Sequence, residues 1–81
     1  LAALLTTLYD RQVTMYQAVL EQGAARGLFA LQGPSLRIAR NLVALEDAYG
    51  YRIVARHPSI GHDEAAELLL DYARLATGHP L

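Results

Sequence analysis

Apolar residues recur along the first third of the chain at the spacing of an α-helix. Residues 1–27 contain no proline, and apolar side chains follow one another at steps of three and four, as at Leu1, Leu5 and Leu8. Residues at these steps share one face of a helix. The pattern therefore predicts a helix over residues 1–27. Its apolar side holds two rows, Leu1, Leu5, Leu8, Met15 and Val19 in one and Tyr9, Val13, Tyr16 and Leu20 in the other.

Breaks in this pattern separate two further helices. Gly33 and Pro34 interrupt the helical pattern, and a new helix can begin at Pro34, because proline is well placed at the first helical position. A second helix is predicted over residues 34–56, since Pro58 disfavours the helical conformation of His57, the residue before it. A third is predicted over residues 62–77, with Gly78 as its stop. The sequence thus predicts one all-α unit over residues 1–81, made of three antiparallel helices.

The third helix is apolar around most of its circumference. Its polar strip is narrow and consists of Glu64, Glu67, Asp71 and Arg74. A helix of this kind is normally buried in a large core, which two neighbouring helices do not supply. Hydrophobic residues make up 53% of the 81 residues, whereas soluble domains average about 45–50%. We therefore expect a module that pairs with another surface.

Charge and composition exclude several functional classes. The net charge is −1, and basic and acidic residues are interspersed, so no basic stripe offers a footprint for nucleic acid. Charged residues interrupt every apolar run before the length of about 18 residues that a membrane span requires. There is no cysteine, which agrees with a reducing compartment such as the cytoplasm. We expect a cytoplasmic protein that needs no cofactor.

Two polar residues lie on apolar helix faces and are candidates for ligand contacts. Gln12 either lines a pocket walled by Tyr9 and Tyr16 or makes an internal hydrogen bond to another helix, and the second reading is favoured. Glu46 has three open readings: it binds a cationic or hydroxylated ligand, pairs with an arginine of another helix or subunit, or reaches water. The ligand-binding candidates are Tyr9, Gln12, Tyr16, Glu46 and Tyr49.

No catalytic or metal-binding constellation is recognisable. His57, His62 and Asp63 have a spacing that matches no familiar metal site. The sequence also lacks a Ser-His-Asp arrangement, a glycine-rich phosphate loop and a helix with paired Glu-x-x-His ligands. We expect neither an enzyme nor a metal site.

Four segments stand in an order that resembles the C-terminal half of the regulatory domain in TetR-family transcriptional repressors. They are residues 23–29 (GAARGLF), 34–40 (PSLRIAR), 42–48 (LVALEDA) and 63–73 (DEAAELLLDYA). The first is similar to the end of the long helix that precedes the dimerisation pair. Two departures occur, at Gly33, where the family often has Asp, and at Ala48, where it often has Gly. Both keep the local structure.

The resemblance implies a homodimer in which the last two helices form a four-helix bundle with their mates. It also implies an apolar or amphipathic small-molecule inducer, whose binding releases operator DNA from an N-terminal helix-turn-helix domain that this chain lacks. The chain is accordingly expected to be a fragment of a longer repressor. The alternative is a small helical adaptor that docks another protein without a ligand. The expected interface residues are Leu42, Leu45, Tyr49, Ile53, Leu68, Leu69, Tyr72, Leu75 and Ala76.

Overall fold

The computed structural model describes residues 1–56 and 58–80, and this part of the chain folds into three α-helices. They are α1 (Ala2–Ala25), α2 (Ser35–Val54) and α3 (His62–Thr77). The predicted all-α class is confirmed, and each helix lies inside its predicted range. Helix α1 ends two residues early because Gly27 adopts a left-handed φ of 74°. None of the described helices is long and apolar enough to cross a membrane.

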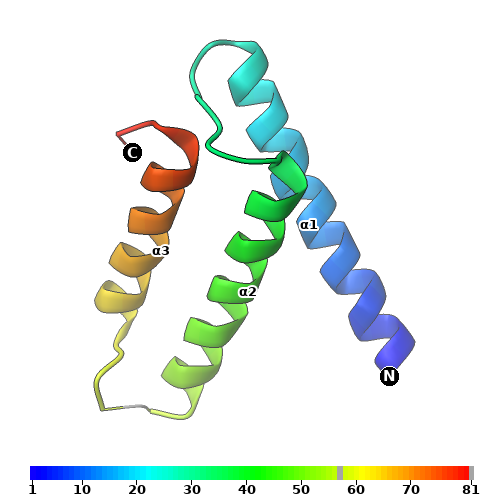
Figure 1. Ribbon diagram of the computed structural model, residues 1–81. Coiled ribbons are helices and arrows are strands. Elements are labelled where there is room, and N and C mark those ends of the chain that lie inside the picture. The colour runs from blue at the N-terminus through cyan, green and yellow to red at the C-terminus, as the bar shows by residue number, and fades with distance from the viewer. Residues whose placement is uncertain (57, 81) are drawn as a thin grey trace.

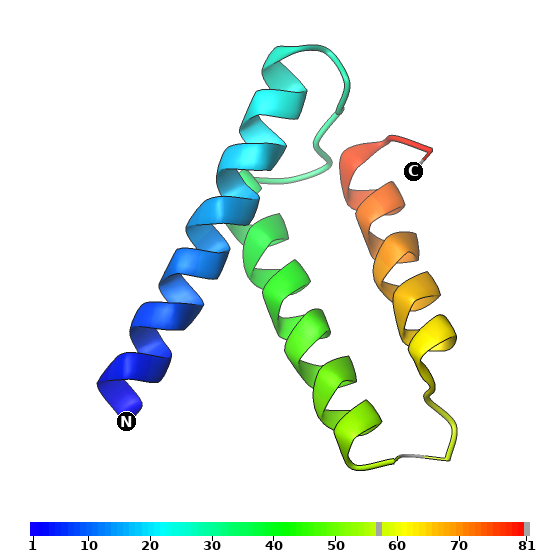
Figure 2. The same ribbon diagram turned by 180° about the vertical axis from the view of Figure 1, so that it is seen from behind.

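Helix α2 lies between the other two. Helices α2 and α3 run antiparallel side by side, while α1 crosses α2 on one side of this pair, behind α2 in Figure 1 and in front of it in Figure 2. The N-terminal end of α1 lies away from both other helices. The molecule measures 39 × 32 × 15 Å and has a radius of gyration of 13.7 Å, against about 12 Å for a compact chain of this length. It is therefore flat and open.

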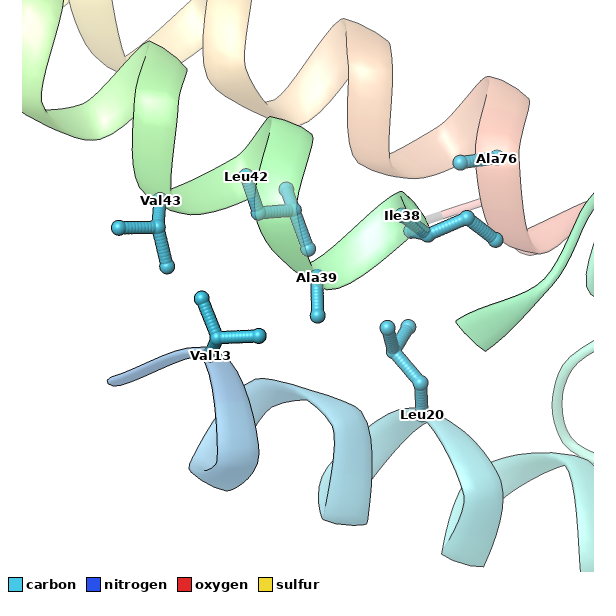
Figure 3. Packing of buried hydrophobic residues seen from close by; sticks show 7 residues of the cluster. All are labelled: Val13, Leu20, Ile38, Ala39, Leu42, Val43 and Ala76. Carbon is cyan, nitrogen blue, oxygen red and sulfur yellow. The ribbon is translucent and has the colours of Figure 1, made fainter. Parts of the chain in front are cut away.

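The core forms where α1 crosses α2 (Figure 3). Ala39 and Val43 of α2 are fully buried there, and side chains of α1 pack against them. The buried cluster consists of Val13, Leu20, Ile38, Ala39, Leu42, Val43 and Ala76. Each fully buried Val, Leu or Ile side chain contributes about 1.5–3 kcal/mol. So few large side chains give the chain a small core.

The row of α1 that packs is the one through Val13 and Leu20, which are 5% and 4% exposed. The row through Leu1 stays in solvent: Leu5 is 56% exposed and Met15 is 57% exposed. The sequence showed two apolar rows on this helix, and in the isolated chain only one of them packs against another helix. The reason is the crossing of the helices, because α1 touches α2 along part of its length and has few contacts with α3.

A notch in α1 holds the start of the loop over residues 26–34. The backbone N–H groups of Leu28 and Phe29 donate to the Gly23 carbonyl at 2.9 and 3.2 Å. The Phe29 ring occupies the space that a Cβ atom on Gly23 would need. Gly23 is buried, so only the absence of its side chain lets Phe29 seat against α1.

The same loop closes the C-terminal end of α3. The N–H of Ala30 donates to the Thr77 carbonyl at 2.7 Å, and the N–H of Gln32 donates to the Ala76 carbonyl at 2.8 Å. The last carbonyls of a helix have no partner within the helix, so these two bonds satisfy groups that would otherwise depend on water. Gly78 ends α3 in the left-handed conformation, with φ 62°. The loop is thus hydrogen-bonded to the C-terminal ends of both α1 and α3.

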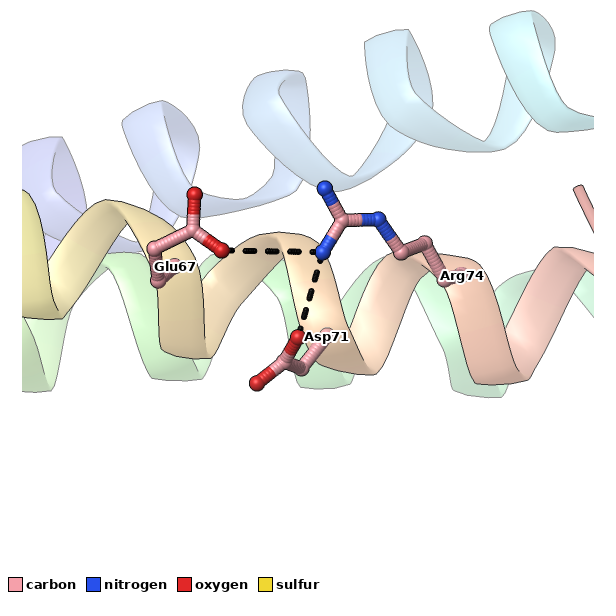
Figure 4. A network of polar contacts seen from close by, with 3 residues as sticks. All are labelled: Glu67, Asp71 and Arg74. Carbon is pink, nitrogen blue, oxygen red and sulfur yellow. Dashed lines mark hydrogen bonds and ion pairs between the residues drawn. The ribbon is translucent and has the colours of Figure 1, made fainter. Parts of the chain in front are cut away.

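The polar strip of α3 carries a small ion-pair network (Figure 4). Arg74 Nη1 lies 3.2 Å from Asp71 Oδ1 and 3.7 Å from Glu67 Oε2. The two carboxylate side chains are 60% and 65% exposed. Exposed pairs of this kind contribute at most about 1 kcal/mol. The strip therefore marks the solvent side of α3 and adds little to stability.

Candidate functional site

A hydrogen bond between α1 and α2 joins two of the predicted ligand-binding residues. The Tyr16 hydroxyl donates to Glu46 Oε2. Both side chains are half-buried, and the crossing of the helices brings them together. From the sequence, three partners of the Glu46 carboxylate were possible: a ligand, an arginine or water. In the structure its partner is a neutral phenol of its own chain.

The pair has a distinct electrostatic character. The hydrogen bond to Glu46, burial, and the negative charges of Glu46 and Asp47 together raise the pKa of Tyr16 to about 12. The phenol therefore stays protonated at neutral pH and remains a donor. In the described part of the chain, ion pairs join Arg74 to Glu67 and Asp71, and no ion pair reaches Glu46.

Two hollows have Leu69 in their walls, and each also has one member of this pair in its wall. The first has a volume of about 220 Å³ and lies among all three helices, with Tyr16 in its wall. The second has a volume of about 250 Å³ and lies between α2 and α3, with Glu46 in its wall. We call the two together the α1–α3 groove. Its lining residues are Tyr16, Val19, Leu20, Phe29, Leu42, Leu69, Leu70, Ala73 and Thr77 in the first hollow, and Glu46, Tyr49, Gly50, Ile53, His62, Ala65, Ala66 and Leu69 in the second.

The walls of the first hollow are almost wholly apolar. Thr77 contributes a hydroxyl, but this group already donates to the Ala73 carbonyl at 2.6 Å. The polar side chains of the α1–α3 groove are therefore mainly the Tyr16–Glu46 pair and, in the second hollow, Tyr49 and His62. A larger hollow of about 420 Å³ lies on the outer surface of α1 and is lined by that helix alone. A binding site requires polar groups that converge from separate elements, and this hollow has none, because one helix lines it.

The remaining predicted ligand residues are divided between two places. Tyr49 lines the second hollow of the α1–α3 groove. Tyr9 and Gln12 line a separate depression nearer the free end of α1, together with Leu5 and Leu8. Gln12 is half-buried, and no side-chain hydrogen bond between described residues involves it. The structure therefore brings Tyr16, Glu46 and Tyr49 to one groove and leaves Tyr9 and Gln12 outside it.

Sequence reasoning missed Phe29 and Thr77, which line the groove from the loop and from the end of α3. Phe29 stands six residues after Gly23, and the pairing of a buried glycine with a nearby aromatic residue is a signal that was available. Thr77 gives no such signal, because its place depends on how the loop docks. The ring of Phe29 also meets the His79 ring edge to face, with centroids 5.6 Å apart.

The side of α2 and α3 that faces away from α1 carries a second apolar surface. A hollow of about 430 Å³ on this side is lined by Asn41, Tyr72 and Leu75, among others, and by no residue of α1. Leu45 and Leu68 lie four residues from Asn41 and Tyr72 and share their helix faces. Leu75 is 76% exposed. We call Leu45, Leu68, Tyr72 and Leu75 the free face.

A polar contact crosses the free face: the Asn41 side-chain amide donates to the Tyr72 hydroxyl at 2.9 Å. This bond ties α2 to α3. The nine expected interface residues fall into three places. Leu42 and Ala76 are buried in the core of the chain, Tyr49, Ile53 and Leu69 line the α1–α3 groove, and the other four form the free face.

No metal centre is found in the part of the chain that the structure describes, where no group of three His, Asp or Glu side chains is placed to hold an ion. His57, one of the residues weighed for such a site, lies outside the described residues.

Comparisons with known proteins give no assignment, since no family model, curated protein or solved structure matches this chain.

Proposed function

We propose that this chain is the dimerisation and effector-sensing region of a TetR-like transcriptional repressor. In this role it couples small-molecule binding to the release of operator DNA by a helix-turn-helix domain outside the chain. The support is the order of sequence segments together with an arrangement that has two separate apolar surfaces. One is the α1–α3 groove, which contains the Tyr16–Glu46 pair, and the other is the free face. No catalytic role is included.

The observation that carries the proposal is the surface area of the isolated chain. It exposes 5777 Å², whereas a compact monomer of 8.9 kDa exposes about 4,800 Å². The excess is about 1,000 Å², and one partner in a standard protein interface buries about 800 Å². The open shape therefore leaves about one interface of surface to be covered. The exposed row of α1 contributes Leu5 and Met15 to it, and the free face contributes Leu75, which is 76% exposed, whereas Leu45, Leu68 and Tyr72 are half-buried.

A second copy is the proposed occupant of the free face. Two-fold pairing places the same patch on both subunits, so the patch must be self-complementary. An apolar surface with leucines around the hydrogen-bonded Asn41–Tyr72 pair meets this need. Ala48 lies seven residues after Asn41 on the same side of α2, and its small side chain lets a partner helix approach closely. Two α2–α3 pairs then form a four-helix bundle.

Sensing follows from the position of α3 between the two surfaces. Leu69 and Ala73 of α3 line the α1–α3 groove, while Leu68 and Tyr72 of the same helix belong to the free face. A guest that shifts α3 against α2 changes the shape of the surface that the second copy meets. Such helix shifts at subunit interfaces are a known form of switching.

The mass of the chain in solution tests this proposal. Multi-angle light scattering at micromolar concentration should give twice 8.9 kDa. The variant Leu75→Glu should give a monomer, because it places a charge on the apolar free face. Val54→Glu is the matched control: Val54 is 84% exposed and lies eleven residues after Val43, on the α1 side of α2. A monomeric wild type would contradict the proposal and favour an adaptor that docks a different protein.

A further inference from the structure

Among the described residues, no basic side chain makes an ion pair with the Glu46 carboxylate. It is half-buried, accepts one hydrogen bond from Tyr16, and takes part in none of the ion pairs between described residues. Asp47 adds a second negative charge nearby. Burying a carboxylate without a cation is costly, and its second oxygen, Oε1, retains room for another donor. The pair is therefore incomplete as it stands.

The surroundings of Glu46 limit what can complete it. The first hollow, on the Tyr16 side, is apolar and is walled by Val19, Leu20 and the Phe29 ring. The second hollow holds Tyr49 and His62 beside Glu46. An anion would meet the negative charge of Glu46, and a neutral apolar molecule would leave the carboxylate as it is. A cation joined to an apolar group satisfies both parts of the groove, and the aromatic faces add to its attraction.

We propose that the α1–α3 groove binds an amphipathic organic cation, an amine attached to a flat apolar group. The charged nitrogen donates to Glu46 beside Tyr16, and the apolar group fills the hollow against Phe29. This inference rests on the proposed sensing role and names the class of effector. Charge-assisted hydrogen bonds to a carboxylate are about twice as strong as neutral ones, so the charge, more than the ring, sets the selectivity.

The same placement shows how the cation acts on the rest of the chain. The apolar group touches Phe29, which is seated in the Gly23 notch of α1, and Thr77, whose carbonyl accepts the Ala30 N–H. Both contacts lie at the points where the loop joins α1 to α3. Occupancy of the hollow therefore presses on the link that sets the position of α3, and through α3 on the free face.

Isothermal titration calorimetry at neutral pH with three probes tests the inference. They share a naphthalene ring and differ in charge at neutral pH. The first, 1-naphthylmethylamine, is a cation; the second, 1-naphthalenemethanol, is neutral; and the third, the acetate formed by ionisation of 1-naphthaleneacetic acid, is an anion. The amine should bind about tenfold more tightly than the alcohol, which corresponds to the gain of one charge-assisted bond, and the acetate should bind most weakly. Equal affinity for amine and alcohol, or no binding of any probe, would overturn the inference.

Three variants assign the selectivity to the pair. Glu46→Gln should remove the preference for the amine and leave the affinity for the alcohol nearly unchanged. Glu46→Asp keeps a carboxylate at this position and should restore a preference for the amine, which guards against a folding defect in the first variant. Glu64→Gln is the control, because Glu64 is exposed at the start of α3. A preference that survives Glu46→Gln would overturn the inference.

The outcome is separable from that of the proposed function. Light scattering on the same samples reports the dimer independently of the probes. A dimer that does not discriminate the amine keeps the pairing role and refutes the cation. A monomer that does discriminate it keeps the cation and refutes the pairing.

Discussion

The contact between Gly23 and Phe29 gives the sharpest test of the packing that shapes the α1–α3 groove. In Gly23→Ala the added Cβ would overlap the edge of the Phe29 ring and lie 3.0 Å from its Cγ. The ring must then leave its seat, although it lines the hollow and meets the His79 ring. Overpacking of this kind costs about 1–3 kcal/mol, and the better helix propensity of alanine returns about 0.5–1 kcal/mol.

We therefore expect Gly23→Ala to lower the free energy of unfolding by about 1–2 kcal/mol, measured by urea titration with far-UV circular dichroism. Gly50→Ala is the matched control, because Gly50 is also helical and a Cβ there meets nothing within 4 Å. It should stabilise by about 0.5–1 kcal/mol. In a Phe29→Ala background, Gly23→Ala should become stabilising too. If Gly23→Ala stabilises the chain while Phe29 is present, the seating of the ring is refuted.

Two further perturbations follow from the structure. The pKa of Tyr16 is raised from 10.0 to about 12, so the bond to Glu46 stabilises the fold below pH 10 and this contribution is lost as the pH rises from 10 to 12. After allowance for solvent screening this contribution amounts to about 1 kcal/mol. The free energies of unfolding of wild type and Tyr16→Phe, measured by urea titration, should therefore approach each other by this amount between pH 10 and pH 12. A constant difference over this pH range would contradict the contribution. Gly78→Ala should cost about 1–2 kcal/mol, because φ is 62° and the new Cβ lies 3.2 Å from the Ala30 carbonyl oxygen. Gly33→Ala, whose Cβ meets nothing within 4 Å, should leave thermal unfolding nearly unchanged, and an equal loss in both variants would speak against the proposed strain.

The helices were predictable because their signals are local. Periodicity marked their apolar sides, and Pro34, Pro58 and Gly78 marked where they begin and end. The apolar half of α2 was also readable, and Glu46 does lie within it. Its partner was not, because the meeting with Tyr16 depends on the angle at which α1 crosses α2. No pattern within a single helix encodes that angle.

The loop over residues 26–34 shows a second limit. Its docking uses backbone groups, with Ala30 and Gln32 donating to carbonyls at the end of α3, and backbone donors leave no mark in a residue pattern. The wide apolar side of α1 misled for a related reason. Two adjacent rows looked equally suited to packing, and only the crossing decided that the row through Val13 is buried while the row through Leu1 is not.

The pairing of two copies through the free face is the central claim, and an electron-spin distance measurement tests it most directly. The chain has no cysteine, so a single nitroxide can be attached at Ala48→Cys, on the side of the free face, or at Val54→Cys, on the α1 side. Pulsed EPR at micromolar concentration should give a short distance between copies at position 48 and a longer one at position 54. Dilution with unlabelled chain should remove both signals. No distance at position 48, or a shorter one at position 54, would contradict pairing through the free face.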